Sequence, residues 1–135
     1  EFILKDMVSR LGIADEFVIA SSATSTEEIF RGVGNPVYPP AREELAKHDI
    51  SCEGKRAVQL QMSDYGKYDL FIGMDSANIR NMTRMLDGDP DRKIRKLMDY
   101  VGGGDVADPW YSGNFQVTYR DIYEGCTALL EEIGD

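Results

Sequence analysis

The sequence predicts an α/β domain built around a small parallel β-sheet. Segments with helical apolar spacing alternate along the chain with short apolar runs, which is the order that βαβ units produce. The clearest buried strand spans residues 68–74, and Asp75 and Ser76, both favoured at the start of a helix, follow it directly. The clearest helix spans residues 115–133, where apolar side chains recur every three or four positions. At 135 residues the chain has about one domain's length, and we expect a single domain over residues 1–135.

The first half of the chain is expected to contain two helices, a strand and a long loop. Residues 2–11 have apolar side chains at helical spacing, and Gly12 after them is a typical helix C-cap. A short strand is expected over residues 16–20 (EFVIA), followed by a long loop over residues 21–40 that is rich in serine, glycine and proline. Residues 41–48 follow a proline pair and predict a short helix.

The second half begins with the buried strand and ends with the long helix. Between them we expect a helix over residues 77–86 and a turn over residues 87–91. Residues 93–101 mix apolar and polar side chains, and a strand is expected towards the end of this stretch. A glycine-rich break over residues 102–105 then leads to Asp-Pro-Trp-Tyr at residues 108–111.

The composition excludes several classes of protein. The 15 Lys and Arg against 24 Asp and Glu give a net charge of −9, which disfavours binding to the phosphates of nucleic acid. The hydrophobic fraction of 42% is too high for an intrinsically disordered chain. No apolar stretch approaches the roughly 18 residues of a membrane-spanning helix. We therefore expect neither a nucleic-acid partner nor a membrane partner.

The cysteines and the histidine limit the possible chemistry. Cys52 and Cys126 lie far apart and have no CxxC spacing, so the sequence predicts neither a disulfide scaffold nor a zinc finger. His48 is the single histidine and ends a predicted helix, where a cation suits the helix dipole. We expect no metal site. The cysteine usage fits a reducing compartment, and with no secretory apolar segment the expected location is cytoplasmic.

The segment over residues 108–111 is the best candidate for chemistry. Asp108 is followed by proline and two aromatics and comes after a glycine hinge, which suits a general acid on a loop at the rim of a pocket. Trp110 and Tyr111 would form an apolar wall, and partial loss of solvent would raise the pKa of the acid. The alternative is a solvent-exposed turn whose aromatics are buried in the core, which is the commoner role of an Asp-Pro pair.

Taken together, the motifs resemble the low-molecular-weight protein-tyrosine phosphatases over essentially the whole chain. The resemblance is carried by the order and spacing of the first helix, the Ser21-Ser22-Ala23-Thr24-Ser25 segment, Gly34-Asn35-Pro36, the strand that runs into Asp75-Ser76-Ala77-Asn78-Ile79, the Asp-Pro-Trp-Tyr loop and the final helix. It implies a three-layer sandwich around a four-stranded parallel sheet.

The resemblance also implies a reaction and roles for particular residues. In that family, a cysteine thiolate in a Cys-x5-Arg loop attacks phosphorus and forms a phosphocysteine intermediate, without a metal or other cofactor. Asp108 matches the acid that protonates the leaving phenolate and then activates water. Trp110 and Tyr111 match the wall beside the substrate ring, and Ser21 matches a serine that supports the phosphate loop. The implied substrate is a phosphotyrosine protein or a small aryl phosphate.

The chain departs from the family pattern at the nucleophile. Val58 lies six residues after Cys52 and Glu132 lies six after Cys126, so no Cys-x5-Arg motif is present. Because the family's phosphate loop precedes its first helix, we expect the nucleophile and the first, central strand to lie ahead of Glu1. The domain is then N-terminally incomplete, and the chain alone is expected to be inactive.

Smaller departures and two alternative functions accompany this prediction. Lys55 lies near the position of a histidine that supports the phosphate loop in relatives. The basic run over residues 92–96 is expected to be a solvated face or an aid to docking of acidic phosphopeptides. One alternative function is an arsenate reductase with the same fold, which would need additional redox cysteines. The other is a non-catalytic module that binds a partner through the rim formed by Trp110 and Tyr111.

Overall fold

A computed structural model of the chain describes residues 1–24, 29–30, 33–34, 37–107 and 113–133. Its 3-10 helices are labelled η. In chain order the elements are α1 (Phe2–Arg10), η1 (Ala14–Glu16), β1 (Ile29–Phe30), β2 (Val33–Gly34), α2 (Pro39–Ala46), η2 (Met62–Asp64), β3 (Phe71–Gly73), α3 (Ser76–Met85), β4 (Ile94–Lys96), η3 (Leu97–Val101) and α5 (Phe115–Ile133).

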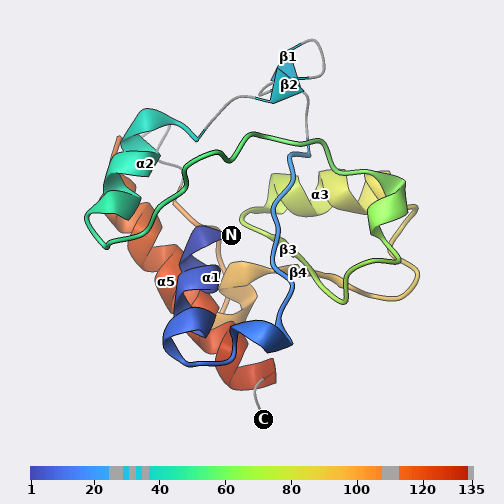
Figure 1. Cartoon of the computed structure of the whole chain (residues 1–135). Helices are drawn as coiled ribbons and strands as arrows, with labels where there is room; N and C mark the ends of the chain where they lie inside the picture. The colour runs from blue at the N-terminus through green and yellow to red at the C-terminus, as the bar shows by residue number, and fades with distance from the viewer. Residues whose placement is uncertain (25–28, 31–32, 35–36, 108–112, 134–135) are drawn as a thin grey trace.

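A parallel pair of strands lies at the centre, with helices on both sides (Figure 1). β3 and β4 pair in parallel, with Phe71 opposite Ile94 and Gly73 opposite Lys96. Helix α3, the crossover between the two strands, lies on one side, while α1 and α5 lie on the other. β1 and β2 form a separate antiparallel pair at the top of the view.

The alternation of side chains along β3 divides the interior into two clusters. Phe71 belongs to a cluster with Met82 and Leu86 of the α3 side. Ile72, the next residue, packs against the cluster formed by α1, η3 and α5. Because successive side chains of a strand point to opposite faces, β3 is covered on both faces. This burial explains why residues 70–74 read as a continuous apolar run.

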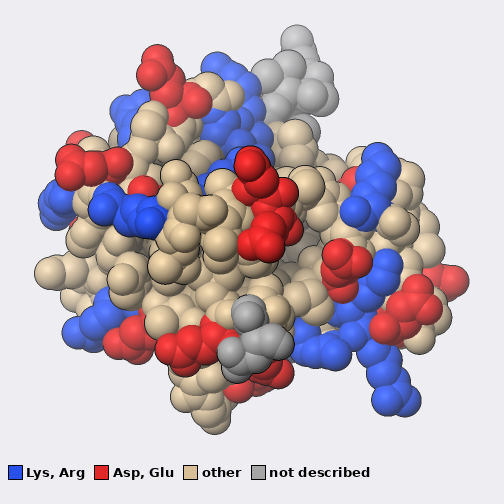
Figure 2. All heavy atoms as spheres, turned by 60° about the horizontal axis from the view of Figure 1, so that its bottom comes forward, with Lys and Arg blue, Asp and Glu red and all other residues tan. Residues whose placement is uncertain are grey.

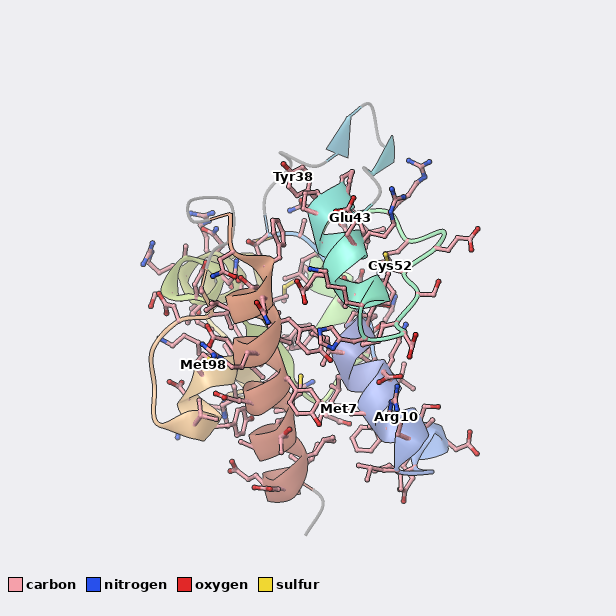
Figure 3. The ribbon with its side chains drawn as sticks, turned by 90° about the vertical axis from the view of Figure 1, so that its left-hand side faces the viewer. Met7, Arg10, Tyr38, Glu43, Cys52 and Met98 are labelled. Carbon is pink, nitrogen blue, oxygen red and sulfur yellow. The ribbon has the colours of Figure 1, made fainter. Side chains whose placement is uncertain are left out.

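Helix α5 is held in the larger cluster by a very close approach to η3. Cys126 and Leu129 on its inner face are buried, and Leu97 of η3 is 2% exposed. Gly125 allows this approach, because a Cβ at that position would lie 2.5 Å from Cγ of Leu97. Figure 3 shows α5 between α1, which carries Met7, and η3, which carries Met98.

The helix predictions are confirmed, with small shifts at the ends. α1 is followed by Gly12 at φ +73°, which fits the expected C-cap position. The carboxylate of Asp75 accepts a 2.8 Å hydrogen bond from the Asn78 N–H and caps α3. The turn before β4 is organised by Asp89, whose carboxylate accepts bonds from the Tyr65 hydroxyl and from the N–H groups of Lys93 and Ile94.

Two strand predictions were wrong. Residues 17–20 do not form a strand: Phe17 is extended, and Phe17 and Ile19 are less exposed than their neighbours, but no backbone ladder pairs the segment with another described residue. Within 93–101, the strand is at the beginning of the stretch and the end is the 3-10 helix η3. Pairing to β3 stops at Gly73, so the chain after Lys96 coils and buries Leu97 and Met98 instead.

The long loop and the sheet also differ from expectation. The stretch over residues 21–40 contains the short β1–β2 hairpin and the first two residues of α2. The parallel sheet formed by the described residues has two strands. With the family's first strand expected ahead of Glu1, three were expected here, and residues 16–20 do not form the third. Ala23 adds an isolated parallel bridge to Gln59.

Charged side chains of both signs are interspersed on the surface. On the face shown in Figure 2, acidic and basic side chains alternate, and neither sign covers the face. Several of them pair at helical spacing, as Arg10 does with Asp6 at 2.7 Å. Two lysines of the basic run over residues 92–96 bind groups within the protein. Lys93 Nζ donates to the Tyr65 carbonyl oxygen at 2.7 Å, and Lys96 pairs with Asp105.

We predict that Gly125→Ala destabilises the protein. Alanine favours a helix over glycine by about 1 kcal/mol, but overpacking in a closed core costs about 1–3 kcal/mol. The clash should dominate, because Leu97 is fully enclosed and cannot move away. Urea unfolding measures the difference in free energy. Gly66→Ala is the matched control, since a Cβ there meets nothing within 4 Å. Equal stability of both variants would contradict the packing described for α5.

Candidate functional site

The proposed acid and its aromatic neighbours lie outside the described residues. Asp108, Trp110 and Tyr111 fall in the undescribed stretch 108–112. The chain on either side is described: residues 102–107 lead in, and Gly113 and Asn114 lead into α5.

The lead-in consists of three glycines followed by three residues that are held in place. Gly102, Gly103 and Gly104 are exposed and all have φ near +100° (107°, 109° and 98°), which favours glycine. Asp105 then pairs with Lys96 at 3.0 Å and accepts a 3.3 Å hydrogen bond from the Ser76 hydroxyl. The hydrogen bond from Lys96 is the main cause that lowers the pKa of Asp105.

The next two residues are fixed through their backbones. Val106 is buried and its N–H donates to the carbonyl oxygen of Met74, just after β3, at 2.9 Å. The N–H of Ala107 donates to Oδ2 of Asp121 at 3.0 Å. The carbonyl oxygen of Ala107 accepts a 2.8 Å hydrogen bond from the Thr118 hydroxyl. Residues of α5 thus bind both polar groups of the residue that precedes Asp108.

Ser21 is described, and it belongs to a charged cluster at the start of α1. Its hydroxyl donates to Oε1 of Glu1 at 2.6 Å, and Lys55 Nζ contacts the same oxygen at 2.8 Å. Lys55 also lies 3.4 Å from the Ser21 carbonyl oxygen, and Lys5 pairs with the second carboxylate oxygen of Glu1. The structure therefore brings Ser21 and Lys55 together at the N-terminal end of the first helix.

The carboxylate of Glu1 is strongly stabilised in its charged form. Its side chain is 6% exposed, and this burial alone would raise the pKa. The hydrogen bonds from Lys5, Lys55 and Ser21 together outweigh burial and lower the pKa of Glu1 from 4.5 to about 2. At neutral pH this cluster therefore contains one negative and two positive side chains.

Both cysteines are buried, and Cys126 does not have the environment of a nucleophile. Burial raises the pKa of the Cys126 thiol to about 11, so it stays protonated at neutral pH on the inner face of α5. Cys52 is also buried and free, and it lines a hollow of about 590 Å³ beside α2 together with Arg42 and Lys55. Two buried thiols provide no evident basis for the redox relay of an arsenate reductase.

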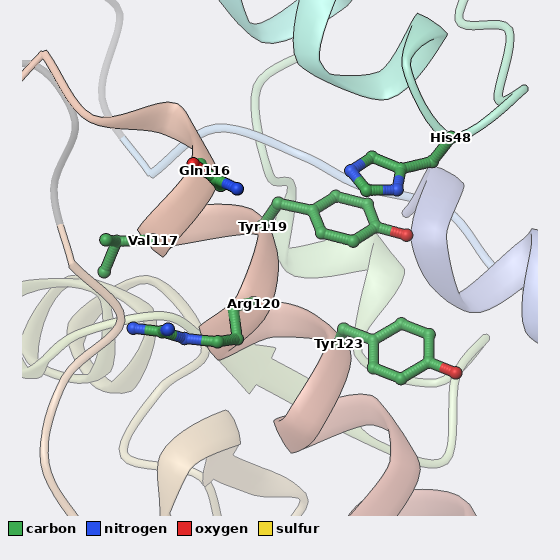
Figure 4. Close-up of a pocket in the computed structure, with 6 residues that line it drawn as sticks. All are labelled: His48, Gln116, Val117, Tyr119, Arg120 and Tyr123. Atoms are coloured by element: carbon green, nitrogen blue, oxygen red, sulfur yellow. The ribbon is translucent and has the colours of Figure 1, made fainter.

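His48 is engaged in contacts within the fold. Its ring stacks on Tyr119 of α5 with centroids 3.6 Å apart, and Nε2 lies 3.1 Å from the buried carboxylate of Glu44. Figure 4 shows this stack at one side of a hollow of about 350 Å³, with Arg120 and Tyr123 below it. The contacts join α2 to α5 and account for the histidine without a catalytic role.

Neither a group of metal ligands nor a membrane-spanning helix is found among the described residues. No three or more histidine, cysteine, aspartate or glutamate side chains there are grouped so that they could hold a metal ion. Among the described helices, none is both long and apolar enough to cross a membrane.

Comparison with known proteins identifies the family. The sequence model of the family described as "Low molecular weight phosphotyrosine protein phosphatase" matches residues 1–135. The chain belongs to this family. The low-molecular-weight protein-tyrosine-phosphatase YfkJ of Bacillus subtilis is 32% identical over 136 residues, which cover 98% of this chain and 85% of that protein. The family's phosphatase from Rattus norvegicus is 28% identical over 140 residues, covering 98% and 84%.

Solved structures of the family have the same fold. The crystal structure of YfkJ superposes with a TM-score of 0.90 at 31% identity, over 99% of this chain and 84% of that chain. The structure of the low-molecular-weight tyrosine phosphatase from Streptococcus pyogenes gives a TM-score of 0.84 at 33% identity, covering 98% and 81%. The α/β fold around a small parallel sheet is thus that of the family.

Sequence reasoning missed the residues of α5 that hold the lead-in to the Asp-Pro loop, residues 108–111. Thr118 and Asp121 lie three positions apart, beside the apolar stripe of the helix, so they share one face. A polar pair at that spacing beside a buried stripe was a usable signal. The cluster around Glu1 was missed because its partners are separated by 20 residues or more in sequence, apart from Lys5.

We predict that Glu1→Gln destabilises the protein at neutral pH and that the difference disappears in acid. The folded pKa of about 2 lies below the ordinary 4.5, so the charged carboxylate contributes stability above about pH 4.5, which is lost as the pH falls towards 2. The loss at pH 7 should be at most on the order of 3 kcal/mol, and less where water screens Lys5.

Urea unfolding of both proteins between pH 2 and pH 7 measures this difference. Glu53→Gln, at an exposed position in the loop before Lys55, is the control and should change little. A pH-independent difference between the Glu1→Gln variant and the parent would contradict the role given to the carboxylate.

Proposed function

We propose that the protein hydrolyses phosphotyrosine monoesters through a phosphocysteine intermediate. Membership of a family whose relative YfkJ is named a protein-tyrosine-phosphatase carries this proposal. The substrate is a phosphotyrosine protein or a small aryl phosphate, and the protein works in the cytoplasm, where its two free cysteines stay reduced.

Asp108 is the proton donor and acceptor of the proposed reaction. In the first step, sulfur of the nucleophile bonds to phosphorus, the bond to the aryl oxygen breaks, and Asp108 gives its proton to the leaving phenolate. In the second step, Asp108 takes a proton from water as the water attacks phosphorus and the sulfur–phosphorus bond breaks. Trp110 and Tyr111 flank the aromatic ring of the substrate.

The nucleophile in this proposal belongs to a Cys-x5-Arg loop that the 135 residues do not contain. We place this loop and the family's first strand before α1, in one domain with residues 1–135. Residues 17–20, which have the composition of a strand, support this placement: Phe17 is extended, and the segment has no ladder partner among the described residues. The family's first strand, placed before α1, would then be the central strand of a four-stranded sheet between two helical layers.

If the phosphate loop precedes α1, Ser21 and Lys55 lie where their side chains could support it. Both lie at the N-terminal end of α1, where that loop would join the helix, and both are already bonded to the Glu1 carboxylate. A helix N-terminus favours a bound phosphate through its free N–H groups and its dipole. Ser21 therefore supports the loop, without contacting the substrate.

We predict that Asp108→Asn slows the protein that carries the phosphate loop. Asparagine cannot donate a proton to the phenolate, so kcat/KM for phenyl phosphate should fall by about 10² or more. Steady-state kinetics on phenyl phosphate measure the loss. Asp87→Asn makes the same chemical change in an exposed turn and should leave turnover unchanged. Unchanged turnover in Asp108→Asn would remove Asp108 from the mechanism.

We predict that the 135-residue chain by itself does not turn over aryl phosphates. It lacks the thiolate and the arginine of the motif, and Cys126 stays protonated. The measurement compares release of 4-nitrophenol by the 135-residue chain and by the same chain with the phosphate loop in place. Hydrolysis by the 135-residue chain would refute the placement of the nucleophile, and none by the longer protein would favour a non-catalytic module.

A further inference from the structure

We propose that Thr118 and Asp121 of α5 are positioning residues that set where the general acid Asp108 enters the active site. This inference rests on the proposed function. The two residues and Ala107 form what we call the entry clamp. The N–H of Ala107 donates to Asp121 at 3.0 Å, and its carbonyl oxygen accepts from the Thr118 hydroxyl at 2.8 Å.

The chain before the clamp cannot set this position by itself. Gly102, Gly103 and Gly104 are exposed, and a Cβ added at any of them would meet nothing within 4 Å. Three glycines without side-chain contacts leave the backbone many accessible conformations. The direction of the chain is therefore determined after them, by the contacts of residues 105–107.

Two contacts precede the clamp and bring the chain to the end of the sheet. Asp105 is tied to Lys96 at the end of β4, and the Val106 N–H is tied to Met74 just after β3. These contacts fix the distance from the sheet. They do not bind the polar groups of Ala107, which the clamp binds instead.

The clamp acts on Asp108 through the peptide bond. The carbonyl of Ala107 and the N–H of Asp108 belong to one planar unit. The Thr118 hydroxyl binds the Ala107 oxygen and so acts on the peptide group through which the chain continues to the next residue. The Asp121 carboxylate accepts a hydrogen bond from the N–H of Ala107. Both backbone polar groups of Ala107 are therefore bound by side chains of α5.

Helix α5 is a rigid support for this grip. One turn beyond Asp121, Gly125 and Cys126 pack into the buried cluster against Leu97. Thr118 and Asp121 therefore have little freedom to move relative to the sheet. A group displaced by about 1 Å can lose about 10² in rate, so a rigid entry point matters for a proton donor.

The clamp has a kinetic signature that a general loss of structure does not produce. A proton donor matters most when the leaving group is a poor one. Phenyl phosphate, whose phenolate needs a proton, depends on Asp108 more than 4-nitrophenyl phosphate, whose phenolate is stabilised by the nitro group. Misplacement of Asp108 should therefore affect the two substrates unequally.

The test uses the protein with its phosphate loop, and kcat/KM on both substrates. We expect Asp121→Ala and Thr118→Val to lower kcat/KM by about tenfold or more for phenyl phosphate, and by less than about threefold for 4-nitrophenyl phosphate. Thr118→Ser keeps the hydroxyl and should restore most of the loss. In an Asp108→Asn background, Asp121→Ala should cause no further loss.

Two variants of α5 serve as matched controls. Thr127→Val removes a hydroxyl that donates to the Tyr123 carbonyl oxygen within the helix, and Glu124→Ala removes an exposed carboxylate. Both should behave like the parent protein. An equal loss on the two substrates, or a further loss in the Asp108→Asn background, would overturn the clamp while leaving the proposed function intact. No effect of Asp108→Asn on phenyl phosphate would overturn both.

Discussion

The fold depends on the contact between Gly125 of α5 and Leu97 of η3. A side chain on residue 125 would lie 2.5 Å from Leu97, so the two elements meet only because that position has none. This approach places Cys126 and Leu129 in the cluster that also receives Ile72 from β3. It also fixes the first half of α5, from which Thr118 and Asp121 reach the chain before the Asp-Pro loop. Packing in the core and the anchoring of Ala107 are thus consequences of one helix position.

The two ends of the site are held by different kinds of interaction. At the start of α1, a buried carboxylate gathers two lysines and Ser21, and its low pKa keeps that cluster charged at neutral pH. At the lead-in to Asp108, neutral backbone groups are bound by side chains of α5. Charge suits the proposed support of a phosphate loop, and fixed backbone suits the proposed position of a proton donor.

Local sequence patterns predicted the elements whose structure is decided locally. The apolar stripe of α5, the cap at Asp75 and the glycine after α1 are each visible within a few residues, and each is found in the structure. Residues 16–20 have the composition of a strand, but a strand needs a partner, and no local pattern reveals whether one is present. Within residues 93–101 the strand is at the beginning and not at the predicted end. Its position depends on where pairing to β3 ends, which no local pattern shows. The clamp joins residues 11 and 14 positions apart, and only the fold brings them together.

Amide hydrogen exchange at Ala107 is the most direct measurement of the central claim. If α5 grips this residue, its amide exchanges slowly, with protection close to that of Val106, whose N–H is bound to Met74. Replacing Asp121 by alanine should then release the Ala107 amide and leave that of Val106 protected. Exchange at Ala107 as fast as at the exposed Gly104, in the unaltered protein, would show that the helix does not hold the chain just before the Asp-Pro loop.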